Sequence, residues 1–213
     1  PVARGLADAR RSVGGVWFDA DEDGDLDLYL ANMDGDQNAL YRNDAGKFSD
    51  VARAIGVDWG GRAPNEAGNG TVRPCTADVD ADGRFDLFTA NYGPNGLFLN
   101  RGGNPGANVQ PGVAGVKIGF PGVGRLEFED ASRAWGIAID ARYDACVFGD
   151  LDNDGRLDVY VNGTVTGGTS YRDYLFRNAG KSFEVATPEN IAAIQADHGA
   201  AWADVDGDGD LDL

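Results

Sequence analysis

The sequence is poor in the residues on which many catalytic and thiolate sites depend. Its 213 residues include two cysteines, one histidine and one methionine. A small scaffold stapled by several disulfides would need more cysteines in a chain of this length. Any site in this chain must therefore be built mainly from other side chains.

Positive charge is also scarce. Lys and Arg total 18 against 35 Asp and Glu, which gives a net charge of −17 with no cluster of basic residues. Nucleic acid is excluded as the main partner, because phosphate binding needs a basic patch. No run approaches 18 apolar residues, so no membrane span is predicted. No signal peptide is visible, but the chain begins at Pro1, so this says little about location.

Glycine and aspartate are abundant, and they fall between short apolar runs. The 32 glycines and this spacing indicate many short strands joined by turns. With 42% hydrophobic residues the chain can build a core. An all-β protein is expected.

One acidic nonamer recurs four times in the chain. The copies are DADEDGDLD (Asp19–Asp27), DVDADGRFD (Asp78–Asp86), DLDNDGRLD (Asp150–Asp158) and DVDGDGDLD (Asp204–Asp212). Each follows a short apolar run. Three are followed by a second run and then by a third that ends in Asn, as in LYRN, LFLN and LFRN. A turn and a fourth segment come next, at Phe48, Phe128 and Phe183. This order predicts a four-stranded antiparallel meander per unit.

Such units pack radially as the blades of a β-propeller, because one meander cannot bury both of its faces alone. We expect about three complete blades and partial blades at both ends, as in a fragment or a partial ring. The predicted divisions are 1–12 for the tail of a preceding blade, 13–57 for blade 1, 58–137 for blade 2 with long loop insertions, 138–197 for blade 3, and 198–213 for the start of blade 4.

Each nonamer has the composition of a metal-binding loop. Aspartates at positions 1, 3, 5 and 9 offer carboxylate oxygens: Asp19, Asp21, Asp23, Asp27; Asp78, Asp80, Asp82, Asp86; Asp150, Asp152, Asp154, Asp158; and Asp204, Asp206, Asp208, Asp212. Position 7 varies, as suits a backbone carbonyl ligand: Asp25, Arg84, Arg156 and Asp210. Position 6 is always Gly, which permits a sharp bend. Position 8 is always apolar (Leu26, Phe85, Leu157 and Leu211), and we expect it to anchor the loop to the core.

Hard oxygen ligands without His or Cys favour Ca²⁺, at up to four sites. Magnesium is less suited because it demands tighter octahedral geometry. An EF-hand is disfavoured, since its position 12 is Glu and here it is Leu30, Thr89 or Val161. Solvated acidic turns are the alternative, but four copies in register argue against them.

The two cysteines lie just before different nonamers. Cys75 stands three residues before Asp78 and Cys146 four before Asp150. If the repeats superpose, the two side chains point to opposite faces of their strands. Two buried free thiols are therefore expected.

The repeats resemble FG-GAP/VCBS repeats, the integrin-α-like propeller blades. The layout of "DLDLYLAN", "LYRN" and "FSDVARAIGV" is most similar to the bacterial ASPIC/UnbV and cartilage acidic protein type. The resemblance implies a propeller, usually of seven blades, with calcium in the hairpin between the first two strands of a blade. The chain departs from the integrin pattern, since Phe148-Gly149 is its only Phe-Gly before a loop and no Gly-Ala-Pro follows.

No catalytic residue is predicted from the sequence. His198 has acidic neighbours, as in a general base, but a turn residue is the favoured interpretation. The aspartate pairs could imitate a glycosidase dyad, yet metal ligation explains their spacing better. Trp59, Tyr171 and Tyr174 lie in or beside variable loops and are the candidate ligand-binding residues. Asn69-Gly70-Thr71 and Asn162-Gly163-Thr164 match the N-glycosylation motif, which often occurs by chance.

The sequence thus predicts a non-enzymatic, calcium-binding propeller segment of a secreted or cell-surface protein. Its expected role is adhesion or binding of a protein or glycan. Two alternatives stay open. One is part of a carbohydrate-active propeller enzyme of the lyase or dehydratase type, and the other is a purely structural scaffold.

Overall fold

The computed structural model describes residues 4–59, 69–102, 126–189 and 198–213, and these form an almost entirely β structure. The first sheet has the order β1-β2-β3-β4. Its strands are β1 (Ser12–Phe18), β2 (Asp27–Asn32), β3 (Ala39–Asp44) and β4 (Lys47–Asp50). All three pairings are antiparallel, as the meander prediction requires.

The second and third meanders are joined in one larger sheet. The second contains β5 (Gly70–Ala77), β6 (Asp86–Pro94), β7 (Gly96–Asn100) and β8 (Phe128–Asp130). The third contains β9 (Asp140–Gly149), β10 (Asp158–Gly163), β13 (Tyr174–Asn178) and β14 (Phe183–Val185). The far end of β6 pairs with the start of β9, at Tyr92 with Arg142 and Pro94 with Asp140. This link between blades was not predicted.

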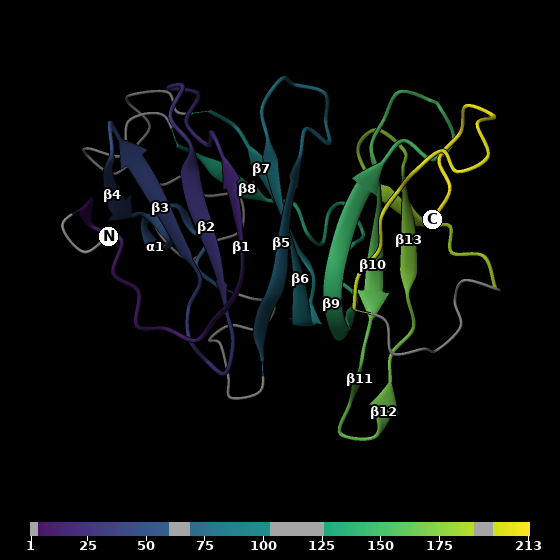
Figure 1. Ribbon diagram of the computed structural model, residues 1–213, viewed down its shortest axis with the longest axis horizontal. Helices are drawn as coiled ribbons and strands as arrows, with labels where there is room; N and C mark the ends of the chain where they lie inside the picture. Colours follow the sequence, from purple (N-terminus) through teal and green to yellow (C-terminus); the bar gives the residue numbers. More distant parts are fainter. Residues whose placement is uncertain (1–3, 60–68, 103–125, 190–197) are drawn as a thin grey trace.

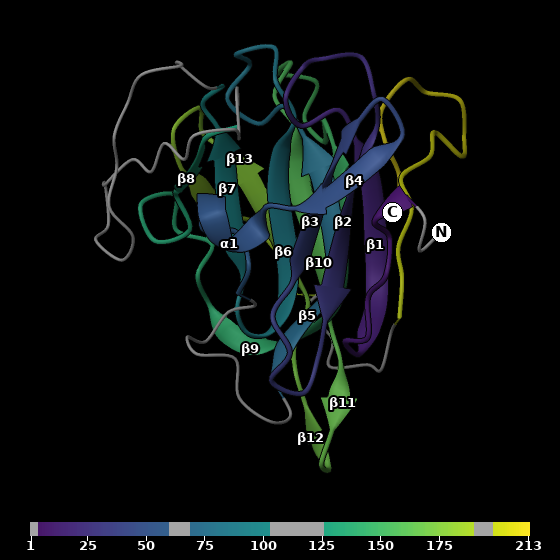
Figure 2. The ribbon, with the colours of Figure 1, turned by 90° about the vertical axis from the view of Figure 1, so that its left-hand side faces the viewer.

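The three meanders stand side by side as successive blades (Figure 1). Their acidic loops lie at the upper end in this view, and the same end is uppermost when the row is seen from its side (Figure 2). A bridge between Ala203 and Asp212 frames the fourth acidic loop. The predicted all-β propeller fold, with three complete four-stranded blades, is confirmed. The exact residue boundaries between blades stay a prediction.

The hydrophobic core lies between blades rather than within one. Leu87 and Phe88 are neighbours on β6, point to opposite faces, and both have no exposed surface. Leu87 packs with Tyr29 and Leu40 of blade 1, while Phe88 packs with Val159 and other residues of blade 3. A strand buried on both faces reads as a continuous apolar run, which explains the imperfect alternation in the sequence.

Cys75 and Cys146 form a disulfide, so the prediction of two free thiols is wrong. Cys75 lies on β5 and Cys146 on β9, the first strands of blades 2 and 3, with their Cα atoms 6.2 Å apart. The opposite facing inferred from the sequence is correct, but adjacent blades meet through opposite faces. The two side chains therefore point at each other.

Position 8 of the acidic loop does not uniformly anchor it to the core, contrary to our expectation. Leu26 is 54% exposed and Phe85 is 50% exposed, whereas Leu157 packs against the core between blades 2 and 3. In the first two loops the side chain at position 8 is half exposed, while the Asp at position 9 is buried. Asp27 and Asp86 are at most 1% exposed.

Two local elements were not predicted. A short helix α1 (Ala52–Ile55) follows β4, and a hairpin of β11 (Val165–Thr166) and β12 (Thr169–Ser170) projects from the lower end of blade 3 (Figure 1). Gly167 and Gly168 turn this hairpin at φ of 58° and 77°, as a type I′ turn requires. No helix among the described residues is long and apolar enough to cross a membrane.

Candidate metal centre

Each acidic loop bends through two residues in the left-handed region. In the first loop these are Glu22 at φ 59° and Gly24 at φ 92°, the fourth and sixth positions. The bend turns the backbone N–H groups of Asp23 and Gly24 onto the carboxylate of Asp19, at 3.2 and 3.0 Å. The other three loops have positive φ at the same two positions: Ala81 and Gly83, Asn153 and Gly155, Gly207 and Gly209. The glycine at position 6 is thus explained by backbone conformation.

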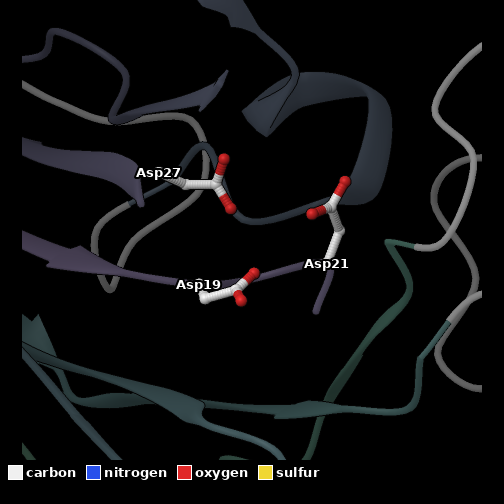
Figure 3. Close-up of side chains that lie close together, drawn as sticks. All are labelled: Asp19, Asp21 and Asp27. Atoms are coloured by element: carbon white, nitrogen blue, oxygen red, sulfur yellow. The ribbon is translucent and has the colours of Figure 1, made fainter. Parts of the chain in front are cut away.

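Three carboxylates converge inside every loop. In the first, Asp19, Asp21 and Asp27 each place an oxygen within 4.8 Å of the others (Figure 3). Positions 1, 3 and 9 do the same in the remaining loops: Asp78, Asp80 and Asp86; Asp150, Asp152 and Asp158; Asp204, Asp206 and Asp212. Such separations suit oxygens that share one cation.

The aspartate at position 9 is held firmly from both sides. The Ala20 N–H donates to Asp27 Oδ2 at 2.8 Å, and the Asn43 N–H donates to Asp27 Oδ1 at 2.7 Å. Asp86 and Asp158 receive the same pair of bonds, from Val79 and Asn100 and from Leu151 and Asn178. This support orients the carboxylate before any ion arrives.

Two buried oxygens in these loops have no hydrogen-bond partner among the described residues. They are Asp21 Oδ1 and Asp80 Oδ1. The Asp21 residue is only 8% exposed, and a buried carboxylate oxygen without a partner is costly. The donor set of oxygens fits Ca²⁺, which would supply the missing positive charge at this point. Asp19, Asp21 and Asp27 would hold it in the first loop.

Burial makes these carboxylates hard to ionise. It raises the pKa of Asp27 to about 6 and that of Asp86 to about 7, and neighbouring loop aspartates add to the rise. The pKa of Asp158 and of Asp21 is also raised, first by burial. Without a cation, these carboxylates would therefore resist full ionisation at neutral pH.

We predict that the metal-free protein loses stability as pH rises from 5 to 8. Between the ordinary aspartate pKa near 4 and the raised values of Asp27 and Asp86, the folded state retains protons that the unfolded state has released. Its free energy of unfolding must then fall with pH, by on the order of a few kcal/mol. The lowered pKa of Asp36, about 2, acts only below this window. Thermal unfolding in chelator at pH 5.5, 6.5 and 8 tests this, and a melting temperature that rises with pH would contradict it.

The aspartates at position 5 lie outside the three-carboxylate groups. Asp82 pairs with the Arg84 guanidinium and Asp154 with that of Arg156. In the first loop, Asp23 accepts the Asp25 N–H at 2.9 Å. Ligation by Asp23, Asp82, Asp154 and Asp208, and by the carbonyls of Asp25, Arg84, Arg156 and Asp210, stays a prediction.

The three aromatic candidates are partly buried, and one of them packs against the core. Trp59, Tyr171 and Tyr174 are each half-buried. Tyr174 stacks on Phe176, with ring centroids 5.5 Å apart, and packs against the core between blades 2 and 3. Ligand binding by these three residues stays a prediction.

The remaining motifs have local structural explanations. His198 is 77% exposed on its side chain, and its Nδ1 lies 2.8 Å from Asp144 Oδ2. Both asparagines of the glycosylation motifs are buried, Asn69 at 5% exposure and Asn162 at 2%. Folded protein thus offers neither of them to a modifying enzyme.

The role of the asparagine that ends the third strand was not predicted from the sequence. Asn43, Asn100 and Asn178 fix the position 9 aspartate through their N–H groups and bind loop carbonyls through their side chains. Their recurrence in LYRN, LFLN and LFRN was visible, and only the partner was not.

Comparison with known proteins agrees with this architecture. A model of the FG-GAP-like repeat family matches residues 19–89 and 164–213, more than half of the chain. Cartilage acidic protein 1 of Xenopus tropicalis is 28% identical over 196 residues, and that of Mus musculus is 27% identical over 203. Each alignment covers 88% of this chain and 26% of the relative, so the chain spans about a quarter of the length of these curated relatives.

The matched ranges contain three of the four acidic loops. The loop at Asp150–Asp158 lies outside them but has the same carboxylate group and the same supporting hydrogen bonds. Repeat sequence, blade topology and family match agree, and the chain belongs to the FG-GAP-like repeat family.

Proposed function

We propose that the chain is a calcium-binding propeller segment of a secreted or cell-surface protein, used for adhesion through a protein or glycan partner. The observation that carries the calcium assignment is the first loop. There Asp19, Asp21 and Asp27 converge, and the buried Oδ1 of Asp21 has no partner among the described residues. Four divalent ions would bring the net charge from −17 to −9.

The Cys75–Cys146 disulfide supports an extracellular location. Disulfides persist in oxidising compartments and are rare in the reducing cytosol. Extracellular calcium reaches millimolar levels, which would keep even weak oxygen sites filled. The proposal assigns no catalytic residue, since the single histidine is largely exposed and contacts Asp144.

We predict that calcium raises the melting temperature and that magnesium at equal concentration does not. A site filled at 100 times its Kd contributes about 2.7 kcal/mol, or roughly 5–10 °C per site in a domain of this size. Thermal unfolding at pH 7.5 in chelator, in calcium and in magnesium measures the shift.

The loop variant Asp21→Asn should lose part of this calcium response. Its matched control is Asp44→Asn, an exposed carboxylate outside the loops that pairs with Arg42. An unchanged melt of the unmodified chain in millimolar calcium would reject the calcium assignment.

The partner proposal needs its own test. Binding to arrays of glycans and matrix proteins should appear in calcium and vanish in chelator. Turnover of a polysaccharide without array binding would instead favour the carbohydrate-active alternative.

A further inference from the structure

The blades are joined at their acidic loops by buried asparagine side chains. Asn100 of blade 2 donates from Nδ2 to the Ala20 carbonyl in the loop of blade 1, at 2.9 Å. Asn178 of blade 3 donates in the same way to the Val79 carbonyl in the loop of blade 2, at 2.8 Å. Both asparagines have no exposed surface. The contact thus recurs at equivalent positions of two blade pairs.

Each asparagine is also attached to the loop of its own blade. The Asn100 N–H donates to Asp86 Oδ1 at 2.8 Å, and its Nδ2 lies 3.3 Å from the Phe85 carbonyl. Its Oδ1 accepts the Gly102 N–H at 3.0 Å. These bonds leave the Asn100 side chain little rotational freedom. A shift of either loop must therefore displace the other.

The residue whose carbonyl accepts the asparagine bond also donates its own N–H to the position 9 aspartate of its loop. The Ala20 N–H donates to Asp27 Oδ2, and the Val79 N–H donates to Asp86 Oδ2 at 2.9 Å. The hydrogen bonds therefore form one path through three position 9 aspartates. It runs along Asp27, Ala20, Asn100, Asp86, Val79, Asn178 and Asp158.

We propose that this path couples neighbouring metal sites, so that calcium in one loop raises the affinity of the next. The inference rests on the calcium binding proposed above. Filling the first loop fixes Asp27 and with it Ala20, the partner of Asn100. The bonds that already orient Asp86 are then held more tightly before its own ion binds, and the second event costs less conformational entropy. Asn100 and Asn178 are the positioning residues.

The test compares the first site with and without its neighbour. In the full chain, Asp152→Asn and Asp206→Asn remove calcium binding at the third and fourth loops. Calorimetry then measures calcium affinity at the first loop. Silencing the second loop by Asp80→Asn should lower this affinity about fivefold or more, the usual lower range of coupling between sites. Adding Asn100→Ala should reduce that factor to near one.

Asn43→Ala is the matched control. Asn43 occupies the same position in blade 1, and its Nδ2 is bonded only to the Leu26 carbonyl of its own blade among the described residues. This variant should weaken the first site and leave the coupling factor unchanged. Equal loss of coupling in Asn43→Ala and Asn100→Ala would overturn the proposal, because it would mean a general structural effect.

Two further outcomes separate this inference from the function it rests on. Tight calcium binding without coupling in the unmodified chain would reject the path but keep the calcium assignment. Absence of calcium binding would reject both.

If Asn100→Ala does not fold, NMR on the folded Asp80→Asn chain decides. Calcium at the first loop should slow hydrogen exchange of the Asn100 side-chain amide. An unchanged rate would overturn the proposal.

Discussion

The variant with Cys75→Ser and Cys146→Ser is expected to lose about 4 kcal/mol of unfolding free energy. The disulfide closes a loop of 71 residues, and loop-closure entropy for that length gives a value of this order. In a chain of this size the melting temperature should fall by roughly 10 °C. Thermal and urea unfolding of the variant beside the oxidised protein would measure it.

Controls identify the cause of this loss. Either single serine variant should lose about as much as the pair, because each breaks the same bond. Reductant should lower the melting temperature of the unmodified protein and leave the double variant unaffected. A double variant that melts within about 2 °C of the oxidised protein would show that blade packing alone fixes β5 against β9.

The disulfide shows that superposing the repeats does not reveal which residues of adjacent blades contact each other. Cys75 and Cys146 differ by one position in the repeat, so their side chains face opposite ways. If the two units are superposed on one blade, the two side chains lie on opposite faces of its sheet and do not meet. In a row of blades the face of one unit meets the opposite face of the next, so the same parity brings the two sulfurs together. The disulfide therefore depends on how adjacent blades pack, and the sequence of a single repeat does not contain this information.

Local features of the site were predictable because they depend on neighbours in sequence. The aspartate spacing gave three converging carboxylates per loop, and the bend at Gly24 follows from its position. The exposure of Leu26 was not predictable, since the buried place of Asp27 depends on the N–H group of Asn43, 16 residues away. Neither was the bond from Asn100 to Ala20, which spans 80 residues and exists only once two blades pack.

Asp86→Ala is expected to be the most damaging single change in the second loop. It leaves the buried N–H groups of Val79 and Asn100 without an acceptor, at about 1–3 kcal/mol each. In chelator at pH 8 the net loss should be nearer 2 kcal/mol, because removing a carboxylate of raised pKa relieves an unfavourable buried charge. In calcium the proposed metal ligand is lost as well, and the loss should reach on the order of 5 kcal/mol.

Asp82→Ala distinguishes ligation from general loop damage. Asp82 accepts the Arg84 N–H and pairs with its guanidinium, but it lies outside the three-carboxylate group of Asp78, Asp80 and Asp86. Its removal should cost under about 1 kcal/mol in chelator, the usual range for a pair near the surface. Urea unfolding of both variants in calcium and in chelator gives four free energies. An equal loss for Asp86→Ala in the two conditions would mean that Asp86 does not bind the ion. A calcium-specific loss for Asp82→Ala as large as that for Asp86→Ala would make position 5 a ligand of equal weight. A nearby carboxylate that does not contact the ion attracts it more weakly and should lose less.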